Sequence, residues 1–288
     1  MPVTSSAFRA AARKALQNHW QTALLIALIV NLPTLLVQAI TSFTGNDPFA
    51  RLEAAVISLS RDGTLSEAAL QSAAEQILHT PGIWIMAGFS VLAWLITPCL
   101  TLGMNHWILD RLRGKEGAVT VVFSRARFFL KAIGLRLFTS LLVLLWMFPG
   151  MAVTFGLTAL LSAQDAVLSD RTFSFIMLIG TFAMLVPGIM AALRYALAVY
   201  FMADLPEKGI RTCVRESVSR MKGHVGMLFS LYLSFILWYL LEMLIASLTL
   251  SFFGAVASLM IQMLCSLALG VYLETAVGAF HEYITGLS

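Results

Sequence analysis

The chain has 288 residues, of which 59% are hydrophobic and 12% are charged, with a formal net charge of +4. A soluble domain is about 45–50% apolar and about 25% charged, so this composition excludes an ordinary soluble protein and indicates one that crosses a membrane several times. The three cysteines, Cys99, Cys213 and Cys265, form no CxxC pair, and they predict neither a disulfide framework nor a zinc site.

Six apolar segments are each long enough to cross about 30 Å of hydrocarbon, which takes about 20 helical residues. We therefore predict an all-α fold with one integral membrane domain, a bundle of six transmembrane helices. The fifth and sixth segments are joined by almost no loop, which predicts a tight helical hairpin. The expected spans are residues 21–43, 82–108, 134–162, 173–203, 224–250 and 252–283.

The segment before the first span, residues 1–20, has the pattern of an amphipathic helix. Its apolar residues recur on one helical face and two basic residues lie beside them, as in helices that lie in a membrane interface. The apolar residues are Phe8, Ala12 and Leu16, and the basic ones are Arg9 and Arg13.

Residues 45–81 form an acidic loop between the first two spans. Thr64 and Glu67 have the spacing of a capping box, which predicts a short helix that begins in the middle of the loop. Two interpretations stay open for this loop, a lid packed on the outer face of the bundle and a solvated connector.

Lysine and arginine mark one side of the membrane. Every basic residue except Arg51, Arg61 and Arg171 lies in the N-terminal segment, in or beside the linker 109–133, or in or beside the linker 204–223. Because basic residues collect on the cytoplasmic side and six is an even number of spans, we predict that both termini are cytoplasmic.

The second of these linkers also has an amphipathic pattern. At 100° per residue, an apolar stripe lies next to a basic stripe, which predicts a helix in the cytoplasmic interface. Together with Arg9 and Arg13, the basic stripe is a candidate site for anionic lipid headgroups; the alternative is that these charges only fix the topology. The apolar stripe is Ile210, Val214, Val218 and Met221, and the basic stripe is Lys208, Arg211, Arg215 and Lys222.

Three charged residues lie deep inside predicted spans, away from the span ends, where a charge costs about 2.5–3.5 kcal/mol on insertion scales. Arg194 and Glu274 come from spans that both run inward, and we expect them to meet at a similar depth as a structural ion pair. The alternative is a carrier in which Glu274 titrates. For Glu242 the expected partners are Gln262, Thr249 or a loop residue.

The sequence contains no motif for catalysis, cofactor binding or a complete metal site. His106 and Asp110 share a helix face, and so do Glu274 and His281, but each pair offers two ligands where metal sites use three or four. No HExxH or GxSxG motif and no nucleotide-binding loop occurs. We therefore expect a protein that is not an enzyme and that holds neither metal nor cofactor.

Proline–glycine pairs interrupt two consecutive spans. Phe148-Pro149-Gly150 and Val186-Pro187-Gly188 lie in helices of opposite direction, which is compatible with helix kinks that serve packing or with the hinges of a transporter.

Several runs of residues resemble the bacterial membrane-protein family known as domain of unknown function 975. The resemblance implies a multi-pass protein of the bacterial cytoplasmic membrane, of a mainly Gram-positive lineage, and it implies no reaction. It is carried by Asn18-His19-Trp20, Leu112-Arg113-Gly114-Lys115-Glu116, Pro187-Gly188-Ile189, Arg194-Tyr195-Ala196-Leu197, Ala203-Asp204-Leu205-Pro206, Arg215-Glu216-Ser217, Met221-Lys222-Gly223-His224, Leu233-Ser234-Phe235-Ile236-Leu237-Trp238 and Ala279-Phe280-His281-Glu282.

Taken together, these patterns predict a membrane scaffold or accessory protein that binds lipid or a membrane protein partner, and no nucleic acid. Two alternatives stay open: a small secondary transporter that uses Glu274, and an intramembrane enzyme of lipid metabolism. The oligomeric state is not indicated by the sequence.

Overall fold

The computed structural model describes residues 4–45, 48–61, 67–163 and 170–286, and every regular element in this part of the chain is a helix. One of them, η1, is a 3-10 helix. In chain order the elements are α1 (Ser5–Leu16), α2 (Trp20–Thr44), α3 (Pro48–Arg61), α4 (Glu67–Leu78), α5 (Pro81–Leu112), η1 (Val119–Phe128), α6 (Phe129–Ala163), α7 (Asp170–Tyr195), α8 (Ala198–Asp204), α9 (Ile210–Met221) and α10 (Val225–Gly286).

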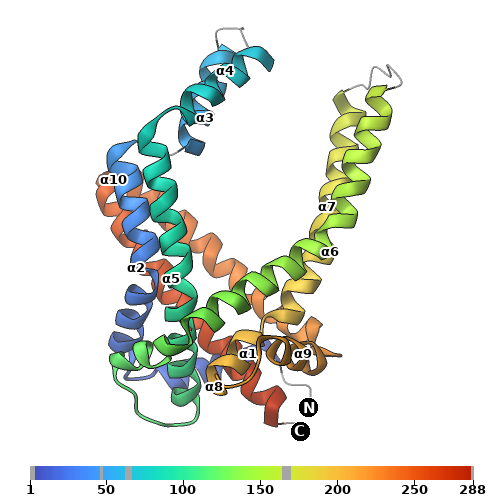
Figure 1. Cartoon of the computed structure of the whole chain (residues 1–288). Coiled ribbons are helices and arrows are strands. Elements are labelled where there is room, and N and C mark those ends of the chain that lie inside the picture. The colour runs from blue at the N-terminus through green and yellow to red at the C-terminus, as the bar shows by residue number, and fades with distance from the viewer. Residues whose placement is uncertain (1–3, 46–47, 62–66, 164–169, 287–288) are drawn as a thin grey trace.

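Within the described residues, six helical segments are long and apolar enough to cross a membrane, which confirms the predicted number of spans. Large apolar side chains on α2, α5, α6, α7 and α10 stay exposed, as expected for surfaces that contact lipid rather than water. Both chain ends lie at the same end of the molecule (Figure 1), as an even number of crossings requires. We call this the terminal end.

The spans form two arms that meet at the terminal end and separate toward the other end (Figure 1). One arm consists of α2 and α5, and the other consists of α6 and α7. Helices α3 and α4 continue beyond α2 and α5 and lie apart from the tips of α6 and α7, which favours a connector over a lid across the whole face. The predicted capping residue Thr64 lies outside the described residues, and α4 begins at Glu67 as expected for the short helix.

The α6–α7 arm is held together by close contact at glycines. A Cβ atom at Gly150 would lie 2.6 Å from the carbonyl oxygen of Ala183, and one at Gly180 would lie 2.2 Å from Oγ1 of Thr154. Because small residues let membrane helices approach closely, these positions account for the tight pairing. Both Pro–Gly pairs end on a packing glycine, since a Cβ atom at Gly188 would lie 2.7 Å from Cγ of Met147, and this favours packing over a hinge.

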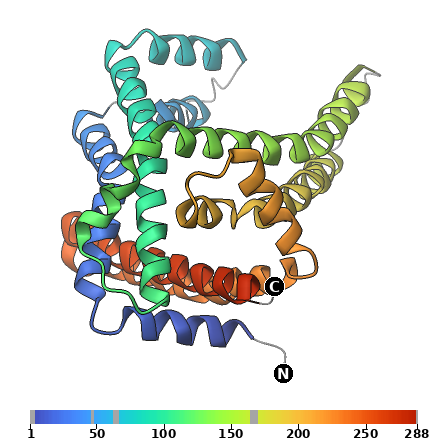
Figure 2. The same cartoon turned by 60° about the horizontal axis from the view of Figure 1, so that its bottom comes forward.

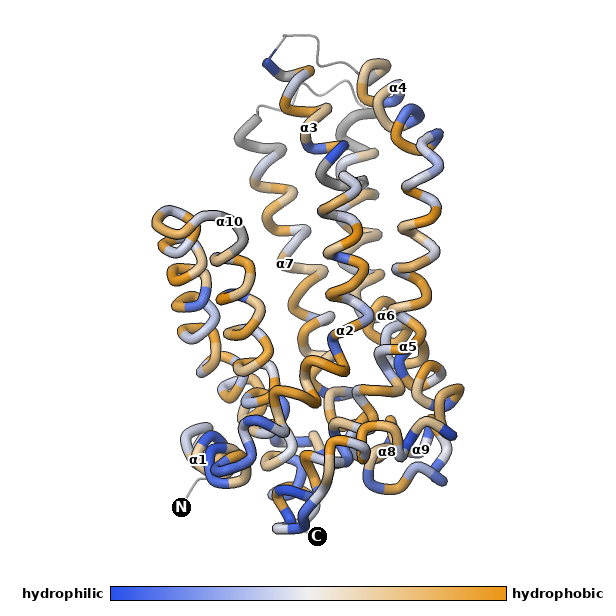
Figure 3. Tube along the Cα trace, turned by 90° about the vertical axis from the view of Figure 1, so that its left-hand side faces the viewer, coloured by the Kyte–Doolittle hydropathy of each residue, from blue (hydrophilic) through white to orange (hydrophobic). Residues whose placement is uncertain are grey.

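Helix α10 is a hairpin that contains the fifth and sixth spans. The chain reverses at Gly254, whose φ of 83° and ψ of 175° are rarely accessible to other residues. The two halves then run side by side, and Ser258 Oγ donates to the carbonyl of Ala246 across them at 2.8 Å. Figure 3 shows this hairpin standing apart from the taller arms.

The buried core lies at the terminal end, where the amphipathic helices cover the spans (Figure 2). In α1, Phe8, Ala12 and Leu16 are all buried, and the Phe8 ring meets the Phe280 ring at 5.4 Å. The predicted apolar stripe is therefore real, but it faces protein rather than lipid.

The apolar stripe of α9 is also covered by protein rather than lipid. Val214 and Met221 are buried, and Ile210 and Val218 are partly buried. The helix packs on α6, α7, α8 and α10, so its apolar face is used by the fold. The reason is that α7 ends early and leaves an apolar surface at the terminal end for α9 to cover.

The fourth predicted span is not one continuous helix. Helix α7 ends at Tyr195, a turn follows, and the short α8 begins at Ala198. No proline or glycine marks this break in the sequence. It is stabilised by tertiary contacts, because α8 packs between α5 and α9 and buries Tyr200, Met202 and Ala203.

Candidate functional site

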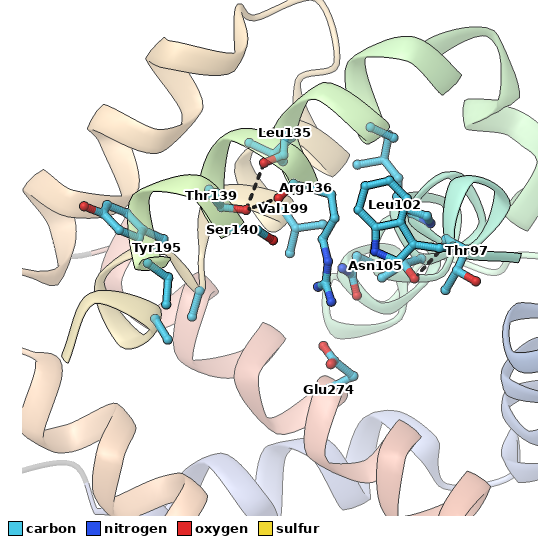
Figure 4. Close-up of a pocket in the computed structure, with 18 of the residues that line it drawn as sticks. Thr97, Leu102, Asn105, Leu135, Arg136, Thr139, Ser140, Tyr195, Val199 and Glu274 are labelled. Carbon is cyan, nitrogen blue, oxygen red and sulfur yellow. Dashed lines mark hydrogen bonds between the residues drawn. The ribbon is translucent and has the colours of Figure 1, made fainter. Parts of the chain in front are cut away.

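A cavity of about 860 Å³ lies where the two arms separate, and it is lined by α2, α5, α6, α7, α8 and α10. Its upper walls are largely apolar, with Trp94 from α5 and Val143, Leu144 and Met147 from α6. Its two charged groups lie nearer the terminal end, where Glu274 and Arg136 point toward a common space beside Asn105 (Figure 4). The cavity is therefore amphipathic along its length.

Glu274 is held in this cavity by Tyr200. The tyrosine hydroxyl donates to the Glu274 carboxylate at 2.6 Å and also lies 2.8 Å from the Glu274 backbone carbonyl. Near this contact α10 packs closely on α5 at Gly278, where a Cβ atom would lie 2.8 Å from Cγ2 of Ile108. The hydrogen bond from Tyr200 fixes one carboxylate oxygen while the other remains available.

The predicted ion pair between Arg194 and Glu274 is wrong. The Arg194 guanidinium lies 5.9 Å from the centre of the Trp146 ring, and Arg194 does not line the cavity. The turn between α7 and α8 explains the error, because it takes Tyr200, rather than Arg194, to the level of Glu274. The Arg194 carbonyl instead accepts a hydrogen bond from Ser217 of α9 at 2.7 Å.

Arg136 and Asn105 are cavity residues that the sequence reading did not select. Arg136 lies in α6 and points toward the same space as Glu274 (Figure 4). Asn105 lies in α5, is fully buried, and neither its Oδ1 nor its Nδ2 has a hydrogen-bond partner in the described part of the chain. The criterion that selected Glu274, a charge deep inside a predicted span, selected neither of them, because Arg136 lies near the start of its span and Asn105 carries no charge.

The hydroxyl groups of three cavity threonines are occupied by their own helices. Thr97 donates to the carbonyl of Ala93 at 2.8 Å, and Thr101 donates to that of Thr97 at 2.9 Å. Thr139 makes the same kind of bond to Leu135 at 2.9 Å. Such back-bonded hydroxyls satisfy polar groups in an apolar helix, and none of the three is paired with a base.

Glu242 lies away from this cavity, inside the α10 hairpin. Ser266 Oγ hydrogen-bonds to its carboxylate across the two halves. The predicted partners Gln262 and Thr249 are therefore wrong. Glu242 is 7% exposed, and its contact is one that stabilises the hairpin.

A second polar cluster closes the terminal end. Arg113 donates to Asp204 at 2.6 Å and to Glu282 at 2.8 Å, so it joins the ends of α5, α8 and α10. The hydrogen bond to Asp204, with that to Glu282, raises the pKa of Arg113 above its usual value, and the guanidinium stays charged. This network fixes the floor beneath the cavity.

Potential metal ligands do not converge. His106 and Asp110 do share a face, with Nε2 and Oδ2 3.4 Å apart, as predicted. The third neighbour of His106 is Arg125, a cation, at 3.2 Å. Within the described ranges, no three histidine, cysteine or carboxylate side chains are placed to hold a metal ion.

The basic residues that were predicted to bind lipid headgroups differ in how exposed their side chains are. Lys208 is engaged by Glu216, whose two carboxylate oxygens each lie 2.8 Å from its Nζ. Arg9 is partly buried, with its Nε enclosed by protein. The exposed candidates are Arg13 on α1 and Arg211, Arg215 and Lys222 on or beside α9.

Comparison with known proteins places the chain in a family. The model of the family described as protein of unknown function DUF975 matches residues 1–288. The chain belongs to the DUF975 family. The match confirms the resemblance that the sequence indicated, and it covers the whole chain. No curated protein and no solved structure matches it.

Proposed function

We propose that this DUF975 protein is a non-enzymatic accessory protein of the bacterial cytoplasmic membrane that binds a membrane lipid between its two arms. The observation that supports this proposal is the cavity itself. Its volume of about 860 Å³ lies in the range of sites for small molecules, which is roughly 300–1,000 Å³. Apolar walls with a few convergent polar groups at one end suit an amphipathic ligand.

The cavity is long enough for both the acyl chain and the headgroup of a lipid in one leaflet. Its lining runs along α5 from Asn105 to Ser90 and along α6 from Ala132 to Met147. Fifteen helical residues span roughly 22 Å at about 1.5 Å each. Half of the hydrocarbon core is about 15 Å thick. An acyl chain beside the upper walls with a headgroup at the polar end would therefore fill it.

Catalysis is less well supported than binding. An activated nucleophile needs a neighbouring base, and the hydroxyls of Thr97, Thr101 and Thr139 bond to their own helices instead. Transport remains a second candidate because Glu274, the acidic residue that a carrier would use, lies in the cavity. A carrier would move the bound lipid or a coupled cation across the membrane in reconstituted vesicles, whereas an accessory protein would only retain the lipid.

The terminal end is proposed to face the cytoplasm. The exposed basic residues Arg13, Arg211, Arg215 and Lys222 all lie there, as does the cluster around Arg113. Positive charge collects on the cytoplasmic side and attracts anionic headgroups. The bound lipid would then come from the cytoplasmic leaflet.

Filling the cavity tests the proposal. In the Ser140→Trp variant an indole would occupy the space beside Arg136, because Ser140 lies on the cavity wall (Figure 4). We expect native mass spectrometry to find lipid retained by the wild-type protein and lost from this variant. Ser230→Trp is the matched control, since Ser230 is exposed on α10 and does not line the cavity. Equal lipid retention in all three proteins, or in none, would disprove binding in the cavity.

A further inference from the structure

Two opposite charges line the cavity without pairing. Arg136 reaches in from α6 and Glu274 from α10, and both point toward the space between them (Figure 4). No ion pair joins them, and within the described residues the Arg136 guanidinium makes no hydrogen bond to protein. A charge inside a span, as at Glu274, is normally paired or used, and the Arg136 side chain is exposed toward the same space. The space between these groups therefore suits a ligand that carries charge of both signs.

Asn105 adds a third unsatisfied group at the same place. It is 0% exposed, it lines the cavity beside Arg136, and both polar atoms of its amide lack a partner in the part of the chain that the structure describes. A buried donor or acceptor without a hydrogen bond destabilises the folded protein. The amide lies just beneath the cavity surface, so a phosphate that accepts from Nδ2 next to the Arg136 guanidinium requires the neighbouring side chains to move aside.

Tyr200 orients the acidic side of the site. Its hydroxyl donates a hydrogen bond to Oε2 of Glu274, and Oε1 has no hydrogen-bond partner among the described residues. A carboxylate oxygen that is held in place by a neighbour is suited to accept a hydrogen bond from a cationic donor. The donor cannot be Arg194, which lies over Trp146.

We infer that the ligand is a phospholipid whose headgroup carries both a phosphate and a primary ammonium, as in phosphatidylethanolamine. The inference rests on the proposed lipid-binding function and specifies its ligand class. Arg136 and the Asn105 amide bind the phosphate oxygens, and the ammonium donates to Oε1 of Glu274. The acyl chains lie along the apolar walls near Trp94 and Leu144.

Other headgroups match these three residues less well. Phosphatidylglycerol has the phosphate for Arg136 but no cation for Glu274, so the carboxylate would lack its charged donor. Phosphatidylcholine has a cation but no N–H, and it cannot donate a hydrogen bond to Oε1. A soluble phosphoethanolamine ester has the headgroup chemistry but has no acyl chains to bury against the apolar walls.

The test is native mass spectrometry of the full chain in detergent, with equal concentrations of phosphatidylethanolamine, phosphatidylglycerol and phosphatidylcholine. We expect the wild-type protein to retain phosphatidylethanolamine at least about tenfold better than the other two, since neither of them has an ammonium that can donate a hydrogen bond to the Glu274 carboxylate. Soluble glycerophosphoethanolamine should fail to displace it. Displacement at comparable concentration would overturn the assignment of a lipid.

Two variants test which residue binds the ammonium and which binds the phosphate. Glu274→Gln should lose the preference for phosphatidylethanolamine but still bind phosphatidylglycerol, and Arg136→Gln should bind all three lipids weakly. Glu242→Gln and Arg194→Gln are matched controls, because they change the same residue types in spans outside the cavity. They should retain the wild-type preference.

The outcomes separate this inference from the function on which it rests. If the wild-type protein retains no lipid at all, lipid binding itself is wrong. If it binds the three lipids equally, lipid binding stands and the headgroup assignment is overturned. That comparison uses the wild-type protein alone, so it holds even where a variant fails to fold.

Discussion

Tyr200 donates its hydroxyl to the carboxylate of Glu274 at 2.6 Å, and this contact joins the short helix α8 to the second half of the α10 hairpin. Tyr200 is 1% exposed, so the hydroxyl has no alternative partner in water. The contact thus has two consequences: it fixes the break between α7 and α8, and it orients an acidic group toward the cavity.

Substituting Tyr200 by phenylalanine should destabilise the protein. The change removes a hydrogen bond to a carboxylate, which contributes about 1.5–3 kcal/mol, while the ring packing is kept. We expect the unfolding temperature in detergent to fall by several degrees. Tyr239→Phe is the control, because the Tyr239 hydroxyl makes no hydrogen bond to the described residues and its side chain is 37% exposed. Equal unfolding temperatures for the two variants would contradict this role of Tyr200.

Gly103 should be intolerant of even a single methyl group. A Cβ atom there would lie 1.9 Å from the carbonyl oxygen of Val122, so α5 and η1 could not keep their present contact. Because the obstacle is backbone, we expect Gly103→Ala to cost about 1–3 kcal/mol or more. Thermal unfolding of the purified variant measures the loss.

The same substitution at Gly88 is a matched control in the same helix. No atom lies within 4 Å of a Cβ atom placed there. Gly88→Ala should be neutral or slightly stabilising, since alanine favours a helix. A loss of stability at Gly88 equal to that at Gly103 would show that helix composition, rather than the contact with η1, determines the effect.

Gly254 should be required for the α10 hairpin. Its φ of 83° with ψ of 175° strains any residue that has a Cβ, at a cost of order 1–3 kcal/mol. Gly254→Ala is therefore expected to lower the unfolding temperature, although nothing lies within 4 Å of the new methyl group. Gly270→Ala, at an open position with helical backbone in the same element, should have no such effect. A tolerated Gly254→Ala would mean that the chain reverses without the strained conformation.

Much of the fold could be predicted because hydrophobic length and charge are local signals. Six apolar segments predicted six spans, and the near absence of a loop around Gly254 predicted the hairpin. The periodicity of α1 and α9 predicted helices with a buried face. The periodicity does not indicate whether protein or lipid covers that face, since both are apolar.

The candidate site was predicted only in part. Glu274 was found because a carboxylate in a span is conspicuous, but its partner depends on the turn after Tyr195, which no proline or glycine marks. Arg136 was counted only as a basic residue near a span end. Asn105 carries no charge, and its importance depends on the missing partners of its amide, which are visible only once α5 and α6 are placed together.

The orientation of the terminal end can be tested with two single cysteines. In a background with the native cysteines replaced by alanine, Arg61→Cys reports on the end of α3, and Lys222→Cys reports on the turn between α9 and α10, both at exposed positions. We expect a membrane-impermeant maleimide to label Arg61→Cys in intact cells and Lys222→Cys only after lysis, because basic residues stay on the cytoplasmic side.

The native thiol nearest to the second probe would interfere little even if it were kept. Cys213 is 0% exposed, and burial raises the pKa of its thiol, so little thiolate is available to react. Labelling of Lys222→Cys but not of Arg61→Cys in intact cells would show that the orientation is the reverse of the proposed one. The basic face of α9 and the polar end of the cavity would then lie at the outer leaflet. Labelling of both before lysis would instead show that the two probes lie on the same side, and would contradict the odd number of crossings, three, that separates them along the chain.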